Sequence, residues 1–147
     1  MRRDAVGFIS GVVGGLIKLL LDQFTFGIGI SRVDTIGVFA NMFSLARASS
    51  LWVWVLYILI TGIAGWAVAR LVSKDFVDSY VTAGVILGAV FWGIMNVFFV
   101  VTNLTVPTWS MGVASLLINL ATHMVLGVII TYSLVLYSYE GRKLAIQ

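Results

Sequence analysis

A chain of 147 residues with 61% hydrophobic and only 10% charged residues cannot fold as a free soluble monomer, because a globule of this size has too little interior for that much apolar surface. Its formal net charge of +3 comes from scattered Lys and Arg without a run of four basic residues, which excludes a nucleic-acid-binding patch. The absence of cysteine excludes disulfides and thiolate metal sites. The composition therefore predicts an integral membrane protein.

Four apolar segments are long enough, or nearly so, to cross about 30 Å of hydrocarbon as α-helices of about 20 residues. They cover about 5–24, 51–72, 81–101 and 112–137. None shows the period-two alternation of barrel strands. Gly141, followed by Arg142 and Lys143, is expected to end the fourth helix. The sequence thus predicts an all-α, polytopic membrane protein that forms one transmembrane helical domain over 1–147.

The link between the first two spans contains a further apolar segment, 33–48, which is too apolar for a solvated loop and too short to span easily. Ser31 and Asp34 match the capping-box pattern, with Ser31 as the N-cap residue. We expect a short helix that either lies at the membrane interface or re-enters the bundle. Its short length favours the interfacial arrangement.

Basic residues are concentrated on one side of the predicted bundle. The two tails and the link between the second and third spans carry Arg2, Arg3, Arg70, Lys74, Arg142 and Lys143. The opposite side carries only Arg32 and Arg47. Cytoplasmic segments of membrane proteins have an excess of Lys and Arg. We therefore expect a multi-pass protein of the cell membrane with both termini in the cytoplasm.

Small residues recur at helical spacing in three of the spans. The glycines are Gly7, Gly11 and Gly15 in the first span, Gly65 in the second, and Gly84 and Gly88 in the third. A face of small residues lets two apolar helices approach closely in lipid. We expect these faces to pack helices within the chain's own bundle. The alternative is a seam between copies in a homo-oligomer.

Lys18 lies about 20 Å into the first span, a depth at which a charge is costly. Asp22 follows one turn later on the same helical face, so the two side chains are in position to pair. Two interpretations stay open. Lys18 either snorkels toward the outer headgroups or belongs to a polar site inside the bundle.

Three further polar residues are predicted near the same depth. Asn96 lies about 22 Å up the third span, and Asn119 lies about 10 Å below the outer end of the fourth. His123 is one turn deeper than Asn119. With Lys18 and Asp22, they are candidates for a binding site in the outer half of the bundle. The favoured alternative is that they only bridge helices by hydrogen bonds.

His123 is the only histidine, and one histidine without cysteine cannot form a metal site from this chain alone. The spans contain no carboxylate except Asp22 at an edge, so they offer no acid–base pair. The sequence contains no Ser-His-Asp set, phosphate-binding loop or HExxH motif. We therefore predict no catalytic residue, no metal and no cofactor. Haem or a quinone held near His123 is the remaining redox alternative.

Several features together resemble a set of small four-helix membrane proteins from spore-forming, Gram-positive bacteria. These features are the glycine-rich segment 7–18, the long semi-apolar link, and a third span with Gly84, Gly88 and Trp92 followed by Leu-Thr-Val-Pro at 104–107. The resemblance covers most of the chain and implies a four-helix membrane fold. It implies no activity, cofactor or site residue.

The sequence predicts a non-enzymatic integral membrane protein that acts as an oligomer or as a small subunit of a membrane complex. A small oligomeric transporter or channel is the first alternative, with the five polar candidates lining its path. A haem or quinone anchor subunit is the second. The expected partners are membrane lipid and either further copies of the chain or other membrane subunits, with no nucleic acid.

Overall fold

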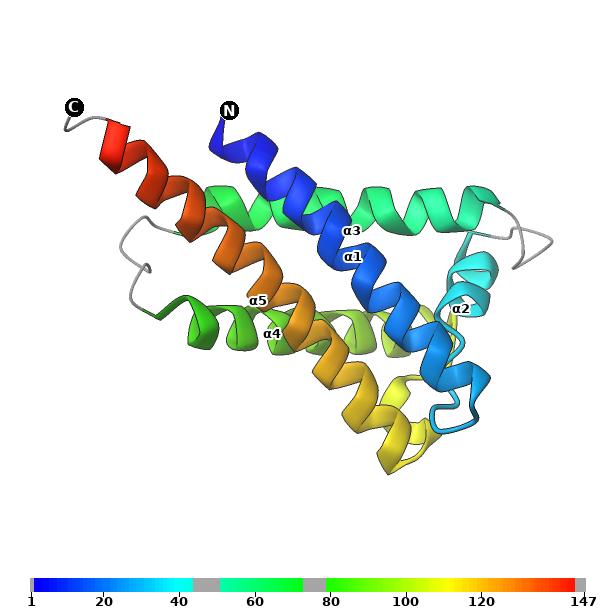
Figure 1. Ribbon diagram of the computed structural model, residues 1–147. Helices are drawn as coiled ribbons and strands as arrows, with labels where there is room; N and C mark the ends of the chain where they lie inside the picture. The colour runs from blue at the N-terminus through cyan, green and yellow to red at the C-terminus, as the bar shows by residue number, and fades with distance from the viewer. Residues whose placement is uncertain (1, 44–50, 73–78, 145–147) are drawn as a thin grey trace.

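The computed structural model describes residues 2–43, 51–72 and 79–144, with side chains described as far as residue 137 in the last helix. The elements are α1 (Arg3–Gly27), α2 (Thr35–Met42), α3 (Leu51–Leu71), α4 (Tyr80–Thr102), the 3-10 turn η2 (Thr108–Met111) and α5 (Val113–Leu144) (Figure 1). Within these residues the chain is helical without a strand, which confirms the predicted fold class. Four helices, α1, α3, α4 and α5, are long and apolar enough to cross a membrane.

The four long helices form two pairs that meet at the centre of the molecule. Helix α1 packs along α3, α5 packs along α4, and the pairs join where α1 contacts α5. In Figure 1, α1 and α5 run diagonally in front of α3 and α4. In the described residues α3 and α4 have almost no direct contact with each other. The start of α1 and the far end of α5 lie at one end of the bundle, and α2 and η2 lie at the other.

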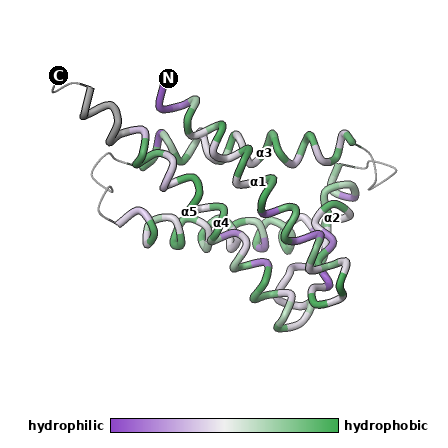
Figure 2. The backbone as a smooth tube through the Cα atoms, in the orientation of Figure 1, coloured by the Kyte–Doolittle hydropathy of each residue, from purple (hydrophilic) through white to green (hydrophobic). Residues whose placement is uncertain are grey.

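The outer surface of the long helices is apolar. Large side chains such as Leu20 and Ile94 are more than half exposed. Figure 2 shows hydrophobic residues along most of the four helices, and hydrophilic residues at the start of α1 and where α1 approaches α2. Such a surface is unfavourable in water but suits contact with lipid tails, in agreement with the length and hydropathy of the four helices.

Helices α1 and α3 meet almost backbone to backbone at glycines. A Cβ atom added to Gly7 would lie 2.5 Å from the Gly65 carbonyl oxygen, and one added to Gly65 would lie 2.8 Å from Gly11 Cα. A Cβ at Gly11 or Gly15 would collide with Thr61. Any larger residue at these positions would force the helices apart, so the glycines set the distance between α1 and α3.

Glycines play the same part between α4 and α5. A Cβ on Gly84 would lie 2.5 Å from Val128 Cα, and one on Gly88 would lie 2.6 Å from Met124 Cα. The six glycines that the sequence marks for packing therefore face helices of the same chain. The alternative interpretation, that these glycines pack copies of the chain against each other, is therefore not supported by their contacts.

The short helix differs from the prediction at its start. Helix α2 begins at Thr35, and its N-cap residue is Asp34, whose carboxylate accepts a hydrogen bond of 3.0 Å from the Gly37 N–H. Ser31, the predicted cap, instead accepts from the Val33 N–H at 3.1 Å and closes a turn before the helix. The carboxylate of Asp34 satisfies a free N–H and also complements the helix dipole. The predicted end near 48 lies outside the described residues.

The last helix is longer than predicted. Helix α5 continues through Gly141 to Leu144, so Gly141 is not its C-cap residue. A glycine inside a helix costs about 1 kcal/mol relative to alanine but does not by itself stop the helix. The residues that follow, Arg142, Lys143 and Leu144, are good helix formers and carry the helix past it.

Candidate functional site

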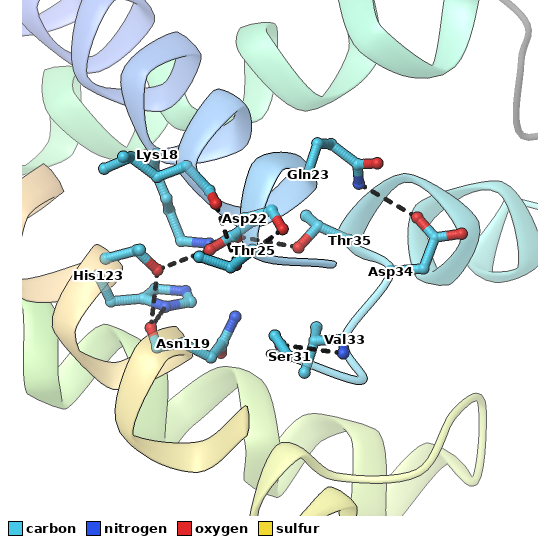
Figure 3. Close-up of polar contacts among 12 residues, drawn as sticks. Lys18, Asp22, Gln23, Thr25, Ser31, Val33, Asp34, Thr35, Asn119 and His123 are labelled. Carbon is cyan, nitrogen blue, oxygen red and sulfur yellow. Dashed lines mark hydrogen bonds and ion pairs between the residues drawn. The ribbon is translucent and has the colours of Figure 1, made fainter. Parts of the chain in front are cut away.

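The polar candidates come together in the half of the bundle away from the chain termini. Lys18, Asn96, Asn119 and His123 all line one cavity of about 60 Å³, and Asp22 lies beside Lys18. Figure 3 shows Lys18 and Asp22 of α1 and Asn119 and His123 of α5 converging next to the segment that leads into α2. The cavity has room for several water molecules or for a small polar group. Most of its lining is apolar, from side chains such as Phe39, Phe91 and Met95, and we call it the polar cavity only after the polar residues that reach it.

Asp22 is the most heavily engaged residue of the site. Its Oδ2 accepts from Lys18 Nζ at 2.5 Å and from the Thr35 hydroxyl at 2.8 Å, and its Oδ1 accepts from the Thr122 hydroxyl at 2.8 Å. One carboxylate thus ties α1 to α2 and α5. A buried ion pair is tolerated where further hydrogen bonds satisfy the charged atoms, as they do here.

Lys18 is buried rather than snorkelling, since only 2% of its side chain is exposed. Its ammonium carries three N–H donors. Asp22 takes one of them, and the Tyr57 side chain faces the ammonium, with its ring centroid 5.9 Å from Nζ. Asp22 and Tyr57 therefore occupy two sides of the Lys18 ammonium. A donor therefore remains for the polar cavity that Lys18 lines.

Asn119 and His123 present unpaired polar atoms to the same cavity. His123 Nδ1 lies 2.7 Å from the Asn119 backbone oxygen, which can only accept, so Nδ1 carries the proton and Nε2 of the neutral ring is an acceptor. Asn119 is 5% exposed, yet its side-chain amide makes no hydrogen bond with any described residue. The same holds for His123 Nε2.

Asn96 has a different role, because both polar atoms of its side chain are already hydrogen-bonded within the protein. Its Oδ1 accepts from the Thr108 N–H at 2.7 Å and from the Thr108 hydroxyl at 2.9 Å, and its Nδ2 donates to the Trp92 carbonyl at 2.9 Å. These bonds fix η2 against α4. Asn96 therefore forms a wall of the polar cavity, and at most the second N–H of its amide is left for a ligand.

The close crossing of α4 and α5 positions the imidazole. Gly88 brings the α4 backbone against the His123 carbonyl, where a Cβ would collide. Almost one turn later on α4, the Phe91 ring centroid lies 5.9 Å from that of His123. The glycine spacing of α4 therefore also fixes one side of the polar cavity.

Four residues of the site were not selected by sequence reasoning. They are Thr35, Tyr57, Thr108 and Thr122. Thr122 adjoins His123, and that adjacency was an available signal. Thr35 and Thr108 lie in connections whose path the sequence does not specify. Tyr57 lies in a nearly uniform apolar helix, where neither spacing nor depth marks it out.

The arrangement is suited to binding an uncharged polar group. Lys18 and Asn119 can donate, and Asn119 Oδ1 and His123 Nε2 can accept. The charge of Lys18 is balanced by Asp22, and that carboxylate is already engaged by three donors. Among the described residues, no group of three or more His, Cys, Asp or Glu side chains is placed to hold a metal ion.

The fold and the site define an all-helical protein with four helices able to cross a membrane and a polar cavity buried between them. Comparisons with protein-family models, with curated proteins and with solved structures give no match. The function of the protein is therefore inferred from the geometry of the cavity.

Proposed function

We propose that this chain is a non-enzymatic integral membrane protein that binds a small uncharged polar group in the polar cavity. The observation that carries the proposal is the Asn119 amide, which faces the cavity and makes no hydrogen bond with any described residue, next to an ammonium with a donor to spare. A ligand can make hydrogen bonds to these atoms in place of water, whereas an ion would bring an unbalanced charge into the membrane.

Transport of the bound molecule is a second candidate function. It is favoured by the near absence of contact between α3 and α4, because helices that share few contacts separate at low cost. In this case Lys18, Asn119 and His123 line the path of the cargo, and Asp22 holds Lys18 in place.

We also propose that the protein works in an assembly, either as an oligomer or as a small subunit of a membrane complex. The support comes from the sequence, in which nearly all of the 147 residues belong to predicted spans and short connections. The glycine faces do not add to it, because they pack within the chain. Partners would therefore contact the lipid-facing surfaces or the exposed ends of the bundle.

We propose that both termini lie in the cytoplasm, which places the polar cavity in the outer half of the membrane. The support is the excess of Lys and Arg in the two tails and the link between α3 and α4. An even number of spans agrees with it, since the start of α1 and the far end of α5 lie at the same end of the bundle.

The binding proposal can be tested by nuclear magnetic resonance on the protein in lipid nanodiscs with isotope-labelled asparagine. The chain has four asparagines, so few side-chain amide signals need assignment, and Asn119→Leu identifies the decisive one. Glycerol serves as the small uncharged probe. We expect the Asn119 amide signal to shift saturably, because that amide is unpaired, and the Asn96 signal to stay, because that amide is already bonded.

Two results would contradict the proposal. One is an Asn119 signal that does not respond to glycerol. The other is an equal response to glycerol phosphate, which would mean that the cavity accepts a charged ligand.

A further inference from the structure

An apolar hollow of about 250 Å³ adjoins the polar cavity and runs from it toward the end of the bundle that carries the termini. Its walls are α3 and α4, and its floor is α5. We call it the apolar groove; its walls include Ala64, Ala67, Val68, Leu87, Val90 and Ile94. Phe91 and His123 line both hollows, so the groove and the polar cavity are neighbours that share these two side chains in their linings.

The groove exists because two helices that are neighbours in sequence do not pack against each other. Helices α3 and α4 lie side by side behind α1 and α5, and they have almost no direct contact in their described residues. Small residues, Ala64 and Ala67 on α3 and Gly88 on α4, line the space between them. From Tyr57 at the polar cavity to Leu71 at the far end, α3 rises about 21 Å.

A mostly apolar hollow with a few polar groups at one end is the usual form of a ligand pocket. The apolar groove suits a hydrocarbon chain, and the polar cavity suits the head of the same molecule. A second copy of the protein packed on α3 and α4 would cover the groove with another apolar helix face. It would leave the Asn119 amide and His123 Nε2 without partners, whereas a polar head satisfies both.

The polar atoms also select the kind of head. His123 Nε2 needs a donor, while Lys18 and the Asn119 amide offer donors. A hydroxyl group does both, because its hydrogen donates and its oxygen accepts. Lys18 lies about 14 Å along the helix from Gly27 at the end of α1, so the head sits well below the headgroup layer. At that depth an uncharged head is far less costly than a phosphate.

We infer that the ligand is a single-chain amphiphile with a hydroxyl-bearing, uncharged head. The head binds Lys18, Asn119 and His123, and the hydrocarbon chain lies in the apolar groove between α3 and α4. The ligand enters sideways from the membrane. The inference rests on the proposed function, to which it adds the chemical class of the ligand and its route of entry.

The experiment uses monooleoylglycerol, which joins the glycerol head to one hydrocarbon chain, and follows the Asn119 amide signal in nanodiscs. We expect the shift of the Asn119 signal to saturate at a monooleoylglycerol concentration at least tenfold below the glycerol concentration that saturates it. The reason is that the hydrocarbon chain adds apolar contact in the groove. Ala64→Phe fills the groove and is expected to abolish this advantage while leaving the response to glycerol. Ala121→Phe, the same change at an exposed position of α5, is the matched control and should behave as the wild type.

The outcomes separate the two proposals. If Asn119 responds to glycerol but Ala64→Phe leaves the response to monooleoylglycerol unchanged, the groove is not the binding site of the chain and the inference is wrong while the proposed function stands. Methyl oleate has the chain without a hydroxyl, and an equally strong response to it would overturn the assignment of the head. A protein that responds to neither glycerol nor monooleoylglycerol contradicts both proposals.

Discussion

Asp22 joins three segments that are distant in sequence, and its contacts determine how the site responds to substitution. Lys18, Thr35 and Thr122 all donate to it, and all four residues are buried. A buried charge with its partner in place is tolerated, but a buried charge that loses its partner is strongly destabilising. The stability of this half of the bundle therefore depends on the balance of the pair more than on either residue.

Asp22→Asn is expected to lower the free energy of unfolding by about 3–5 kcal/mol, because it leaves the Lys18 ammonium buried and unbalanced. The double variant Lys18→Met with Asp22→Asn removes both charges and should lose clearly less than either Asp22→Asn or Lys18→Met alone. Reversible unfolding in mixed micelles measures both. If the effects of the single substitutions simply add in the double variant, Lys18 and Asp22 are not coupled and this account of the site is wrong.

At the scale of the helices, glycine fixes the distance between the members of each pair. The crossings of α1 with α3 and of α4 with α5 put backbone atoms of one helix where the other would carry a Cβ. This close fit replaces the hydrophobic effect, which does not drive association between helices in lipid. It also holds the polar residues in register, since Thr61 and His123 lie at the crossings as well as at the polar cavity.

Gly11→Ala is expected to destabilise the protein by about 1 kcal/mol or more, because the new Cβ collides with the Thr61 carbonyl oxygen, a backbone atom that cannot rotate away. Gly93→Ala is the matched control, since nothing lies within 4 Å of a Cβ at that position. It should be neutral or slightly stabilising, as alanine favours helix over glycine. Thermal unfolding of the two variants in the same nanodiscs compares them, and equal losses would mean that α1 and α3 are not in close contact.

The positions of the four spans and the depth of side chains in them were predictable from the sequence, and contacts made by connecting segments were not. A fixed rise per residue gives the depth of a side chain in its span, and residues predicted near one level, such as Lys18 and Asn119, line one cavity. That Asn96 is occupied by Thr108 depends on the path of η2, which no spacing encodes. The cap of α2 was misassigned for a similar reason, because Ser31 and Asp34 both suit a helix start.

At the scale of the whole molecule, the polar groups are distributed unevenly along the bundle. The end with the termini carries an exposed ion pair, in which Arg70 lies 2.8 Å from Asp4 and which contributes little to stability. The opposite half contains the polar cavity and the buried pair of Lys18 and Asp22. Which half faces the cytoplasm decides from which side a molecule in the membrane meets the polar cavity.

The proposed orientation can be tested with single cysteines, because the chain contains none. Ser110→Cys lies in η2, at the end away from the termini, and is expected to react with a membrane-impermeant thiol reagent on intact cells. Gln147→Cys marks the C-terminus without changing a charge and should react only after permeabilisation, because the excess of basic residues keeps that side in the cytoplasm. The reverse pattern of labelling would contradict the orientation.

The spacing of Lys18 and Asp22 also matters for how the protein enters the membrane. The hydrogen bond from Thr122 to Asp22 joins residues 100 positions apart and forms only once α5 has been synthesised. The ion pair itself lies within α1, four residues apart, and needs nothing from the rest of the chain. Helix α1, which is synthesised before α3, α4 and α5, thus brings its own counter-ion, so two opposite charges enter the bilayer as one neutral unit before those helices exist.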